Sequence, residues 1–505
     1  TPTAGPRRGG VLVYAHRAPP ANYSIWETNT IDIMKFMAPV HANLVRFHPE
    51  DRSMEEIIPD LAERWEQSDD GLTYTFHLRP GLTFNDGSPL ACEDARFTLA
   101  TVRTGEGLNP NPRGPIFQEY VQAEECADDH TLVVRLKRPA PSLLPNLAQG
   151  WMAVFPKAVF QGTGEHMRRS AVGAGPFKLT EVRAGERLGY ERNPGYYNPE
   201  RPYLDGLQIH VVPDNSARLS LLRTGQHHWL DPTPKQVETL RRQEPRIIID
   251  KQESNLGWQV VVMPWGKAPW DDPRVRDAVS LAIDRQGYIL AVHDGNASVG
   301  GALPPGLAFS LPQEKLCEVP GYCGDAEANK AKARQLLADA GYANGLQVSG
   351  HIVRNNQASI DYSTFIAAEL EQVGITAPLV IEDTAVVYDR ITRRDFDFLA
   401  WGHAIAIGDP DAMFFEHFLC ASDRNYGGYC RDEAERLLRQ QSETQDPVRR
   451  RQLLEEYQLM VLKDHAKMTL AWSHGYYAYW PKVHGIVRQP GIYSNIRMDN
   501  VWLEP

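Results

Sequence analysis

Residues 258–285, WQVVVMPWGKAPWDDPRVRDAVSLAIDR, decide how we interpret this chain. They read as an apolar strand, a loop rich in Pro and Trp, and a helix. Asp272 stands at the N-cap of that helix, and Pro273 follows where its missing N–H has no cost. The apolar positions of one helix face are Val275, Ala278, Val279, Ala282 and Ile283. We predict a hinge strand and the first helix of a second lobe.

Length and composition indicate a globular protein with more than one domain. A chain of 505 residues is too long for a single core, so two or three domains are expected. Its 42% hydrophobic and 23% charged residues exclude a disordered or fibrous chain. No run approaches the ~18 apolar residues that a membrane-spanning helix needs. The chain begins at Thr1 without an apolar leader, as expected after removal of a signal peptide or after trimming.

The net charge of −11 disfavours nucleic acid as a partner, because such binding needs Lys and Arg gathered on one face. The basic clusters, such as residues 449–451, are short and are typical of solvated surface.

Four of the six Cys residues predict disulfides. Cys317 and Cys323 bracket a Pro-Gly turn, and Cys420 and Cys430 bracket a polar, Gly-rich loop. Bridges that close such loops imply an oxidising compartment.

The other two Cys residues lie on different predicted elements, Cys92 on a helix and Cys126 near a strand, and the sequence leaves their pairing open. The chain contains no CxxC or HExxH motif and no His beside a Cys pair at zinc spacing. We therefore expect neither a metal site nor a cofactor.

The two halves of the chain have different periodicities. In the first half, residues 72–79 alternate between apolar and polar side chains, as in a half-buried antiparallel strand. In the second half, helices predicted over 328–340 and 361–373 alternate with apolar strands around 347–353 and 375–383. Such alternation predicts a mostly parallel sheet and an α/β fold.

Several segments together resemble the family 5 extracellular solute-binding proteins of ABC importers, which include dipeptide, oligopeptide and nickel-chelate binders. They are GGVLVYA (9–15), LVRFHPED (44–51), the stretch from IIPDLAERW to ARFTL (57–99), GAGPFKL (173–179), RNPGYY (192–197), DDPRVRDAVSLAIDR (271–285), AKARQLLADAGY (331–342) and WGH…GDPD (401–411).

The resemblance implies an α/β, bilobal fold like that of periplasmic binding proteins (type II, cluster C), with a ligand enclosed between the lobes. Lobe one would comprise residues 1–40, 173–258 and 471–505, with an extra α+β subdomain at 41–172. Lobe two would comprise residues 259–470. It also implies export to the periplasm or cell exterior, a membrane permease as partner, and a monomer.

Family resemblance also suggests which solute is not bound. Dipeptide binders of the family hold the ligand's α-ammonium with an Asp shortly after the Trp-Gly that matches Trp401-Gly402. Counting back from the GDPD motif, the matching residue here is Ala406. A buried ammonium without a paired anion costs several kcal/mol. We therefore expect a carboxylate-bearing solute, peptide-like or opine-like, that is not an ordinary dipeptide.

Further site residues come from the same comparison. The family's carboxylate-binding Arg matches Arg354 to within about one residue, although a salt bridge would equally explain an Arg there. His403 could donate to the ligand or contact a chelated metal, which makes a metal-chelate binder the alternative. The remaining candidates for ligand contacts are Trp26, Trp258 and Trp401 as apolar walls, and Asn255, Asn355 and Asp409 as polar groups.

A different class of function, a hydrolase with Asp409 and Asp411 as a carboxylate pair, has little support. Residues two apart in a Pro-containing bend usually point in different directions, and no triad or metal motif accompanies them. We expect no catalytic residues and a protein that is not an enzyme.

Overall fold

The protein is described from a computed structural model. The described residues are 5–27, 31–108, 113–160, 165–405, 407–490 and 496–504, without the side chains of 31, 254–256 and 404.

The chain divides into two compact units. Unit 1 comprises Thr1–Gln252 and Gly475–Pro505, and unit 2 comprises Glu253–His474. Two strands, β12 (Ile248–Val262) and β19 (Met468–Tyr479), begin in one unit and end in the other. The lobe boundaries expected from the sequence, at 258–259 and 470–471, fall inside these strands.

Unit 1 contains strands that pair around β1 (Val11–His16). β1 runs parallel to β10 (Gly206–Val211), and β10 is antiparallel to β9 (Arg187–Arg192), which pairs with β8 (Phe177–Arg183). On its other edge β1 meets β11 (Trp229–Leu230). Alternate residues of β1, beginning with Leu12, are buried, so one face of this sheet covers the core.

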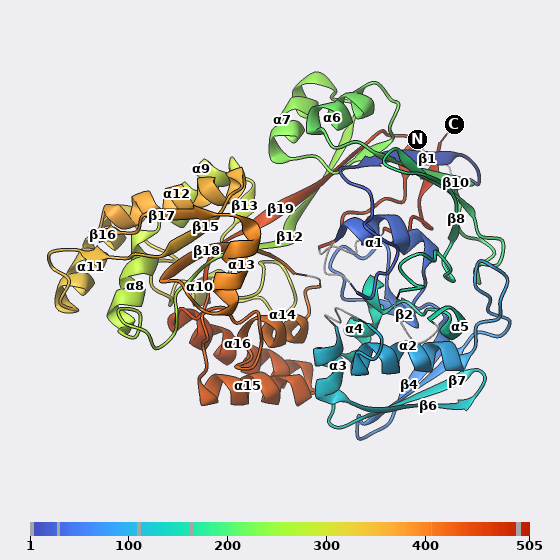
Figure 1. Ribbon diagram of the computed structural model, residues 1–505, viewed down its shortest axis with the longest axis horizontal. Coiled ribbons are helices and arrows are strands. Elements are labelled where there is room, and N and C mark those ends of the chain that lie inside the picture. The colour runs from blue at the N-terminus through green and yellow to red at the C-terminus, as the bar shows by residue number, and fades with distance from the viewer. Residues whose placement is uncertain are drawn as a thin grey trace. The chain divides into compact units, whose positions relative to one another are not determined.

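A second sheet of unit 1 is antiparallel, in the order β4 (Ala62–Gln67), β5 (Thr73–Leu78), β7 (Thr131–Leu136) and β6 (Val121–Asp128). The alternation predicted for residues 72–79 is confirmed, because every second residue of β5 is buried. Helix α2 (Cys92–Thr104) packs on β6 and β7 (Figure 1). Separation of residues 41–172 as a subdomain stays a prediction.

The other elements of unit 1 are short and connect or cover these sheets. They are α1 (Ile31–Met37), η1 (Ala38–Val40), β2 (Val45–Phe47), β3 (Ile57–Pro59), α3 (Gly114–Tyr120), α4 (Leu143–Ala148), η2 (Gly150–Met152), α5 (Lys157–Phe160), α6 (Asn215–Arg223), α7 (Pro234–Gln243), β20 (Val483–His484) and β21 (Trp502–Leu503).

The sheet of unit 2 follows the order β17 (Leu379–Glu382), β15 (His351–Arg354), β18 (Phe398–Ala404), β12 and β19. β15 is parallel to both β17 and β18, whereas β18 is antiparallel to β12. Parallel strands need crossover connections, which α12 (Gln357–Glu371) and α13 (Thr384–Thr392) supply. The mostly parallel sheet expected from the sequence is thus limited to three strands, because β12 arrives from unit 1 without such a crossover.

One helix of unit 2 begins where the sequence predicts, and those predicted from 328 and 361 begin earlier, at Ala326 and Gln357. The Asp272 side chain accepts a hydrogen bond from the Arg274 N–H and caps α8 (Pro273–Ala282), whose predicted apolar face is buried. The segment predicted as a strand over 347–353 is instead split into β14 (Leu346–Gln347) and β15. Two residues without regular structure, 377 and 378, interrupt 375–383 in the same way, between β16 (Ile375–Thr376) and β17.

The other elements of unit 2 are helices and one short strand. They are α9 (Arg285–His293), β13 (Ala297–Ser298), α10 (Gln313–Leu316), α11 (Ala326–Asp339), α12 (Gln357–Glu371), α13 (Thr384–Thr392), α14 (Pro410–Phe418), α15 (Asp432–Glu443) and α16 (Pro447–Lys463).

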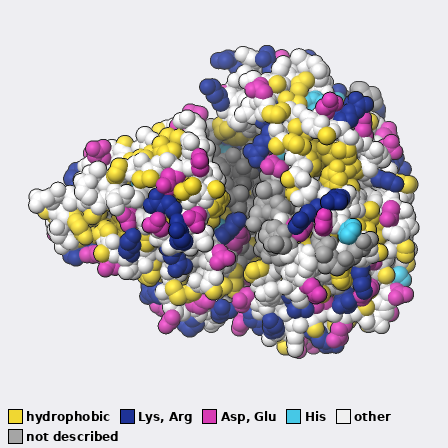
Figure 2. Space-filling model, in the orientation of Figure 1, with side chains coloured by type: hydrophobic (Ala, Val, Ile, Leu, Met, Phe, Trp, Pro, Cys, Tyr) yellow, Lys and Arg dark blue, Asp and Glu magenta, His cyan; other side chains and the backbone are white. Residues whose placement is uncertain are grey.

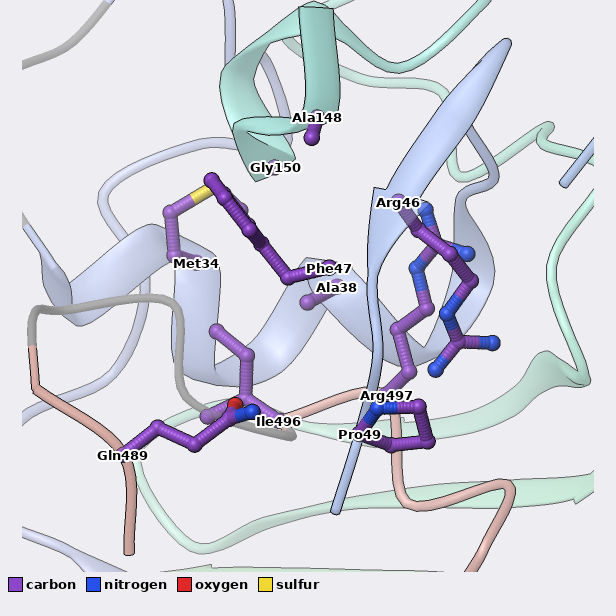
Figure 3. A pocket seen from close by; sticks show the side chains of 10 residues that line it. All are labelled: Met34, Ala38, Arg46, Phe47, Pro49, Ala148, Gly150, Gln489, Ile496 and Arg497. Carbon is purple, nitrogen blue, oxygen red and sulfur yellow. The ribbon is translucent and has the colours of Figure 1, made fainter. Parts of the chain in front are cut away.

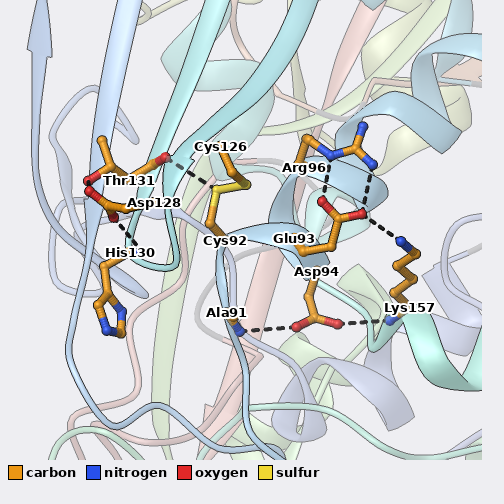
Figure 4. Close-up of a disulfide and its surroundings, with 10 residues drawn as sticks. All are labelled: Ala91, Cys92, Glu93, Asp94, Arg96, Cys126, Asp128, His130, Thr131 and Lys157. Atoms are coloured by element: carbon orange, nitrogen blue, oxygen red, sulfur yellow. Dashed lines mark hydrogen bonds and ion pairs between the residues drawn. A yellow bond between two sulfur atoms is a disulfide. The ribbon is translucent and has the colours of Figure 1, made fainter.

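All six Cys residues form disulfides. The predicted pairs Cys317–Cys323 and Cys420–Cys430 are confirmed. The pairing that the sequence left open is Cys92–Cys126, which ties the start of α2 to β6 (Figure 4).

The surface charges are mixed. On the face shown in Figure 2, Asp and Glu side chains are interspersed with Lys and Arg. Among the residues that the structure describes, no helix has the length and apolar character needed to cross a bilayer.

Removing a disulfide should destabilise the protein more when the loop that it closes is longer. Cys92 and Cys126 are 34 residues apart, and Cys317 and Cys323 are 6 apart. Chain entropy predicts losses of about 4 and about 2 kcal/mol, respectively, when each pair is replaced by Ala. Urea unfolding followed by circular dichroism would measure both. Equal losses, or the opposite order, would contradict this origin of the stabilisation.

Candidate functional site

The register of β12 and β18 positions three of the predicted site residues of unit 2, Trp258, Trp401 and His403. Trp258 lies opposite His403, and Val260 lies opposite Trp401. Side chains of a strand alternate between faces, so these four share one face of the sheet. That face packs into a core cluster shared with α14, α15 and α16.

Arg354, at the end of β15, is held against an aromatic ring. Its guanidinium lies 4.0 Å from the centre of the Trp401 ring, and Nη2 is 3.5 Å from the Tyr362 hydroxyl. Nε is buried without a hydrogen-bond partner in the described part of the chain, and none of the described ion pairs includes Arg354. This arginine therefore carries a charge that no described carboxylate neutralises. The salt bridge that the sequence left open is not found among the described residues.

Aromatic rings continue from this arginine into the unit. Trp401 meets Tyr388 and Tyr426 edge-on, with centroids 5.3 and 6.0 Å apart. Tyr426 stacks on His403 with centroids 5.6 Å apart. Tyr388 is 45% exposed, whereas Trp401 is 3% exposed, so Tyr388 presents an aromatic surface beside the Arg354–Trp401 pair.

His403 belongs to a buried group that includes a lysine. The Nζ of Lys467 lies 3.5 Å from His403 Nε2 and 3.2 Å from His417 Nδ1, and it donates to the Arg424 carbonyl at 2.8 Å. Three groups that can accept a hydrogen bond therefore surround this nitrogen. Trp258 and Tyr426 add ring faces at 5.6 and 5.1 Å.

Burial disfavours charge throughout this group. Burial, and then the charge of Arg424, lowers the pKa of Lys467 well below its usual 10.5. Burial and the charge of Lys467 lower the pKa of both His403 and His417 well below 6.5. Both imidazoles are therefore neutral acceptors at neutral pH, which suits the donors of Lys467.

The structure places two other predicted site residues in hydrophobic cores. Trp258 is fully buried, and its indole N–H donates to Thr469 Oγ1 at 3.0 Å. Trp26, in unit 1, is 1% exposed and donates to the Ala153 carbonyl at 2.9 Å. Both rings have packing partners, and their roles as ligand contacts stay predictions.

The polar candidates differ in what they do. Asp409 caps α14, because its carboxylate accepts from the N–H groups of Asp411 and Ala412. Asp411 is buried and accepts from Gln441 Nε2 at 2.6 Å, and Arg450 Nη2 lies 3.4 Å from Asp411 and 3.9 Å from Asp409, so both carboxylates have structural partners. Asn355 is exposed beside Arg354.

Two further candidates, Ala406 and the side chain of Asn255, lie outside the described residues. Among the described residues, no group of three His, Cys, Asp or Glu side chains is arranged to hold a metal ion.

Sequence reasoning did not identify Lys467, His417 or Tyr426. Each stands in a stretch without a motif, and they come together only through the pairing of strands and the packing of α14. Proximity of His417 and Tyr426 to the GDPD segment was the only signal available.

The fold and this site define a binding protein with two lobes. A family model for "Bacterial extracellular solute-binding proteins, family 5 Middle" matches residues 56–425. The chain belongs to this family, and it is the solute-binding component of an ABC import system, not an enzyme.

Three similar proteins illustrate the range of ligands. A "Probable di/tripeptide-binding protein 5" of Pseudomonas aeruginosa is 27% identical over 86% of this chain and 85% of its own length. The DppA binding protein of Helicobacter pylori, in complex with peptide STSA, has a TM-score of 0.82 at 24% identity, covering 99% of both chains. AgaA of A. tumefacien R10, in complex with agropinic acid, has a TM-score of 0.79 at 23% identity, covering 98% of this chain and 99% of AgaA. The predicted α/β bilobal fold is thereby confirmed.

Buried neutral imidazoles should make the protein less stable in acid. The pKa of His417 is lowered in the folded state, so the unfolded chain binds a proton first as the pH falls below about 6.5, and stability falls with it. His417→Gln, which keeps an acceptor for Lys467, should make the fall between pH 6.5 and 5 shallower by up to about 1 kcal/mol per pH unit. Urea unfolding at several pH values would measure this slope.

A matched control is His166→Gln, because His166 is exposed in unit 1. It should leave the slope unchanged. A His417→Gln slope equal to that of the unmodified protein would show that His417 binds its proton as readily folded as unfolded.

Proposed function

We propose that this protein captures a small solute bearing a carboxylate, peptide-like or opine-like, and delivers it to a membrane permease. Arg354 binds the carboxylate. The observation that carries the proposal is the guanidinium stacked 4.0 Å from the Trp401 ring, without an ion pair among the described residues. Arg presents paired N–H donors to a carboxylate, and stacking on an indole fixes the plane of that fork.

The surroundings of Arg354 favour an anion over a cation. Arg354, Arg424 and Lys467 all contribute to lowering the pKa of His403. Glu416 forms an ion pair with Arg424 at 2.7 Å, which leaves Arg354 without a carboxylate. The family's ammonium-binding Asp is also replaced, by Ala406. An ordinary dipeptide would bring an ammonium to a site without its counter-charge, so we propose that such dipeptides are not the ligand.

Relatives support this class of solute without fixing it, since the named complexes hold a peptide and agropinic acid. The alternative is a metal chelate contacted by His403. The amine of Lys467 lies 3.5 Å from His403 Nε2, so a metal bound through that nitrogen would have to displace the amine. Binding that survives a chelator would remove the chelate alternative. We further propose that the protein works as an exported monomer in the periplasm or cell exterior.

Loss of the proposed carboxylate clamp should weaken binding. Thermal shift over peptides, opine-like conjugates, sugar acids and metal chelates would identify the ligand, since a solute at 100 times its Kd adds about 2.7 kcal/mol of stability. For that ligand, Arg354→Ala should cost roughly 1.5–3 kcal/mol of binding free energy, measured by titration calorimetry.

The control is Arg393→Ala, because Arg393 is exposed on the same unit and pairs with Asp389 at 2.6 Å. It should bind the ligand as the unmodified protein does. Unchanged affinity in Arg354→Ala would reject the clamp.

Restoring the missing carboxylate should change the selectivity. Ala406→Asp should admit ordinary dipeptides with measurable affinity, because it supplies the anion that their ammonium requires. Calorimetry with a dipeptide and with its N-acetylated form would separate recognition of the ammonium from recognition of the rest. Tight dipeptide binding by the unmodified protein would overturn the argument from Ala406.

A further inference from the structure

Unit 1 contains a pocket of about 510 Å³ that the proposed function does not use. Residues from five separate segments line it, among them three arginines: Arg46, Arg79 and Arg201. Its volume is sufficient for a small ion or metabolite. The charges around it decide what it would hold.

The acidic groups of this pocket already have partners. Asp499 accepts from both Nη1 and Nη2 of Arg46, at 2.7 and 3.1 Å, in a buried pair. Glu50 accepts from the side-chain amide of Asn500 at 2.7 Å. Burial raises the pKa of Asp499, but the charge of Arg46 outweighs it and brings the pKa to about 2. The Arg46–Asp499 pair is therefore charged and complete.

A second acidic group lies beside the pocket. Asp60 is fully buried and accepts from Arg497 Nη1 at 2.6 Å and from the Tyr197 hydroxyl at 2.9 Å. Figure 3 shows Arg497 next to Arg46. Arg497 also donates to Asn43 Oδ1 at 2.6 Å, so its fork is occupied.

The other two arginines are different. Arg79 lies 4.7 Å from the Tyr197 ring centre and, among the described residues, its guanidinium donates only from Nε, to the Asp60 carbonyl at 2.8 Å. Arg201 lies 3.9 Å from the Tyr203 ring centre, and its Nη1 is buried with no hydrogen-bond partner in the described part of the chain. None of the described ion pairs includes either arginine. An aromatic ring therefore covers one face of each guanidinium, and each guanidinium keeps N–H groups without an acceptor among the described residues.

The charges do not balance. Four arginines, 46, 79, 201 and 497, surround three carboxylates, those of Asp60, Asp499 and Glu50, which leaves an excess of 4 − 3 = 1 positive charge. The charge of Arg201 also contributes to lowering the pKa of Asp499, so Arg201 lies within electrostatic range of the Arg46–Asp499 pair. An anion in the pocket would neutralise the excess.

We propose that this pocket is a second binding site, for a small oxyanion such as phosphate or a carboxylate, held by Arg79 and Arg201. Planar guanidinium groups match the paired oxygens of both anions. The tyrosine rings hold the two guanidinium planes, and the buried Nη1 of Arg201 gains the acceptor that it lacks. The site is separate from Arg354, which lies in unit 2.

Inorganic phosphate and succinate are the probes. Thermal unfolding of the full chain should shift upward with either anion when compared with chloride at equal ionic strength. The double variant Arg79→Gln, Arg201→Gln should bind the anion more weakly, because the bidentate contacts are lost. Its half-saturating anion concentration should rise about tenfold or more. Comparison of the affinities for phosphate and succinate distinguishes a phosphate site from a carboxylate site.

Controls separate this site from folding and from the proposed function. Arg241→Gln, an exposed arginine on α7 of the same unit, should respond to the anion like the unmodified protein. Arg201→Lys, which keeps the charge but loses the fork, should show intermediate affinity. Arg354→Ala should keep the full phosphate response even where it abolishes solute binding.

Two results would overturn the proposal. One is an unmodified protein in which neither phosphate nor succinate raises the melting temperature above that in chloride. The other is a double variant that folds, shown by an unchanged melting temperature in chloride, and still binds the anion with undiminished affinity.

Discussion

The antiparallel register between β12 and β18 is the constraint on which unit 2 depends. It sets Trp258 against His403 and Val260 against Trp401 on one face, while Val261 and Ala400 turn to the other. The two faces bury two different core clusters. A slip of one residue would exchange the faces and move the indole of Trp401 away from Arg354. The guanidinium on β15 keeps its aromatic support only in the observed register.

Local chemistry in the sequence was sufficient to predict many elements. Asp272 followed by Pro273 fixes the start of α8, because an N-cap acceptor and a proline at the first turn both act within a few residues. The alternation in β5 and the short Cys loops are equally local. The limited extent of the parallel sheet was not predictable in this way, since it depends on where β12 enters unit 2.

The Lys467 group shows why much of the site could not be predicted. Lys467 precedes β19, His403 lies on β18, and His417 lies on α14, so 50 residues or more separate the lysine from either imidazole. No spacing rule connects them. A lysine among apolar residues would ordinarily be read as solvent-exposed, and only packing reveals that three acceptors and several rings surround its amine. The burial that lowers the pKa of Lys467 also makes this part of unit 2 a poor environment for a cation.

Arginines that lie against an aromatic ring in this protein differ in what their N–H groups contact. Arg285 is buried with its guanidinium 4.1 Å from the Tyr322 ring centre, and it donates to the carbonyls of Thr469, Ser280 and Gly321. Those donors tie backbone segments together, so Arg285 is structural.

Arg354 and Arg201 have the same support from a ring but lack such acceptors among the described residues. Stacking on a ring restrains the guanidinium plane without using its N–H groups, which lowers the entropy lost when a planar anion binds. Desolvating a guanidinium and leaving donors unpaired costs free energy in the unbound protein. The oxygens of a bound anion would recover that free energy. An arginine that is stacked on a ring but has unpaired donors is therefore better suited to bind a ligand than to stabilise the fold.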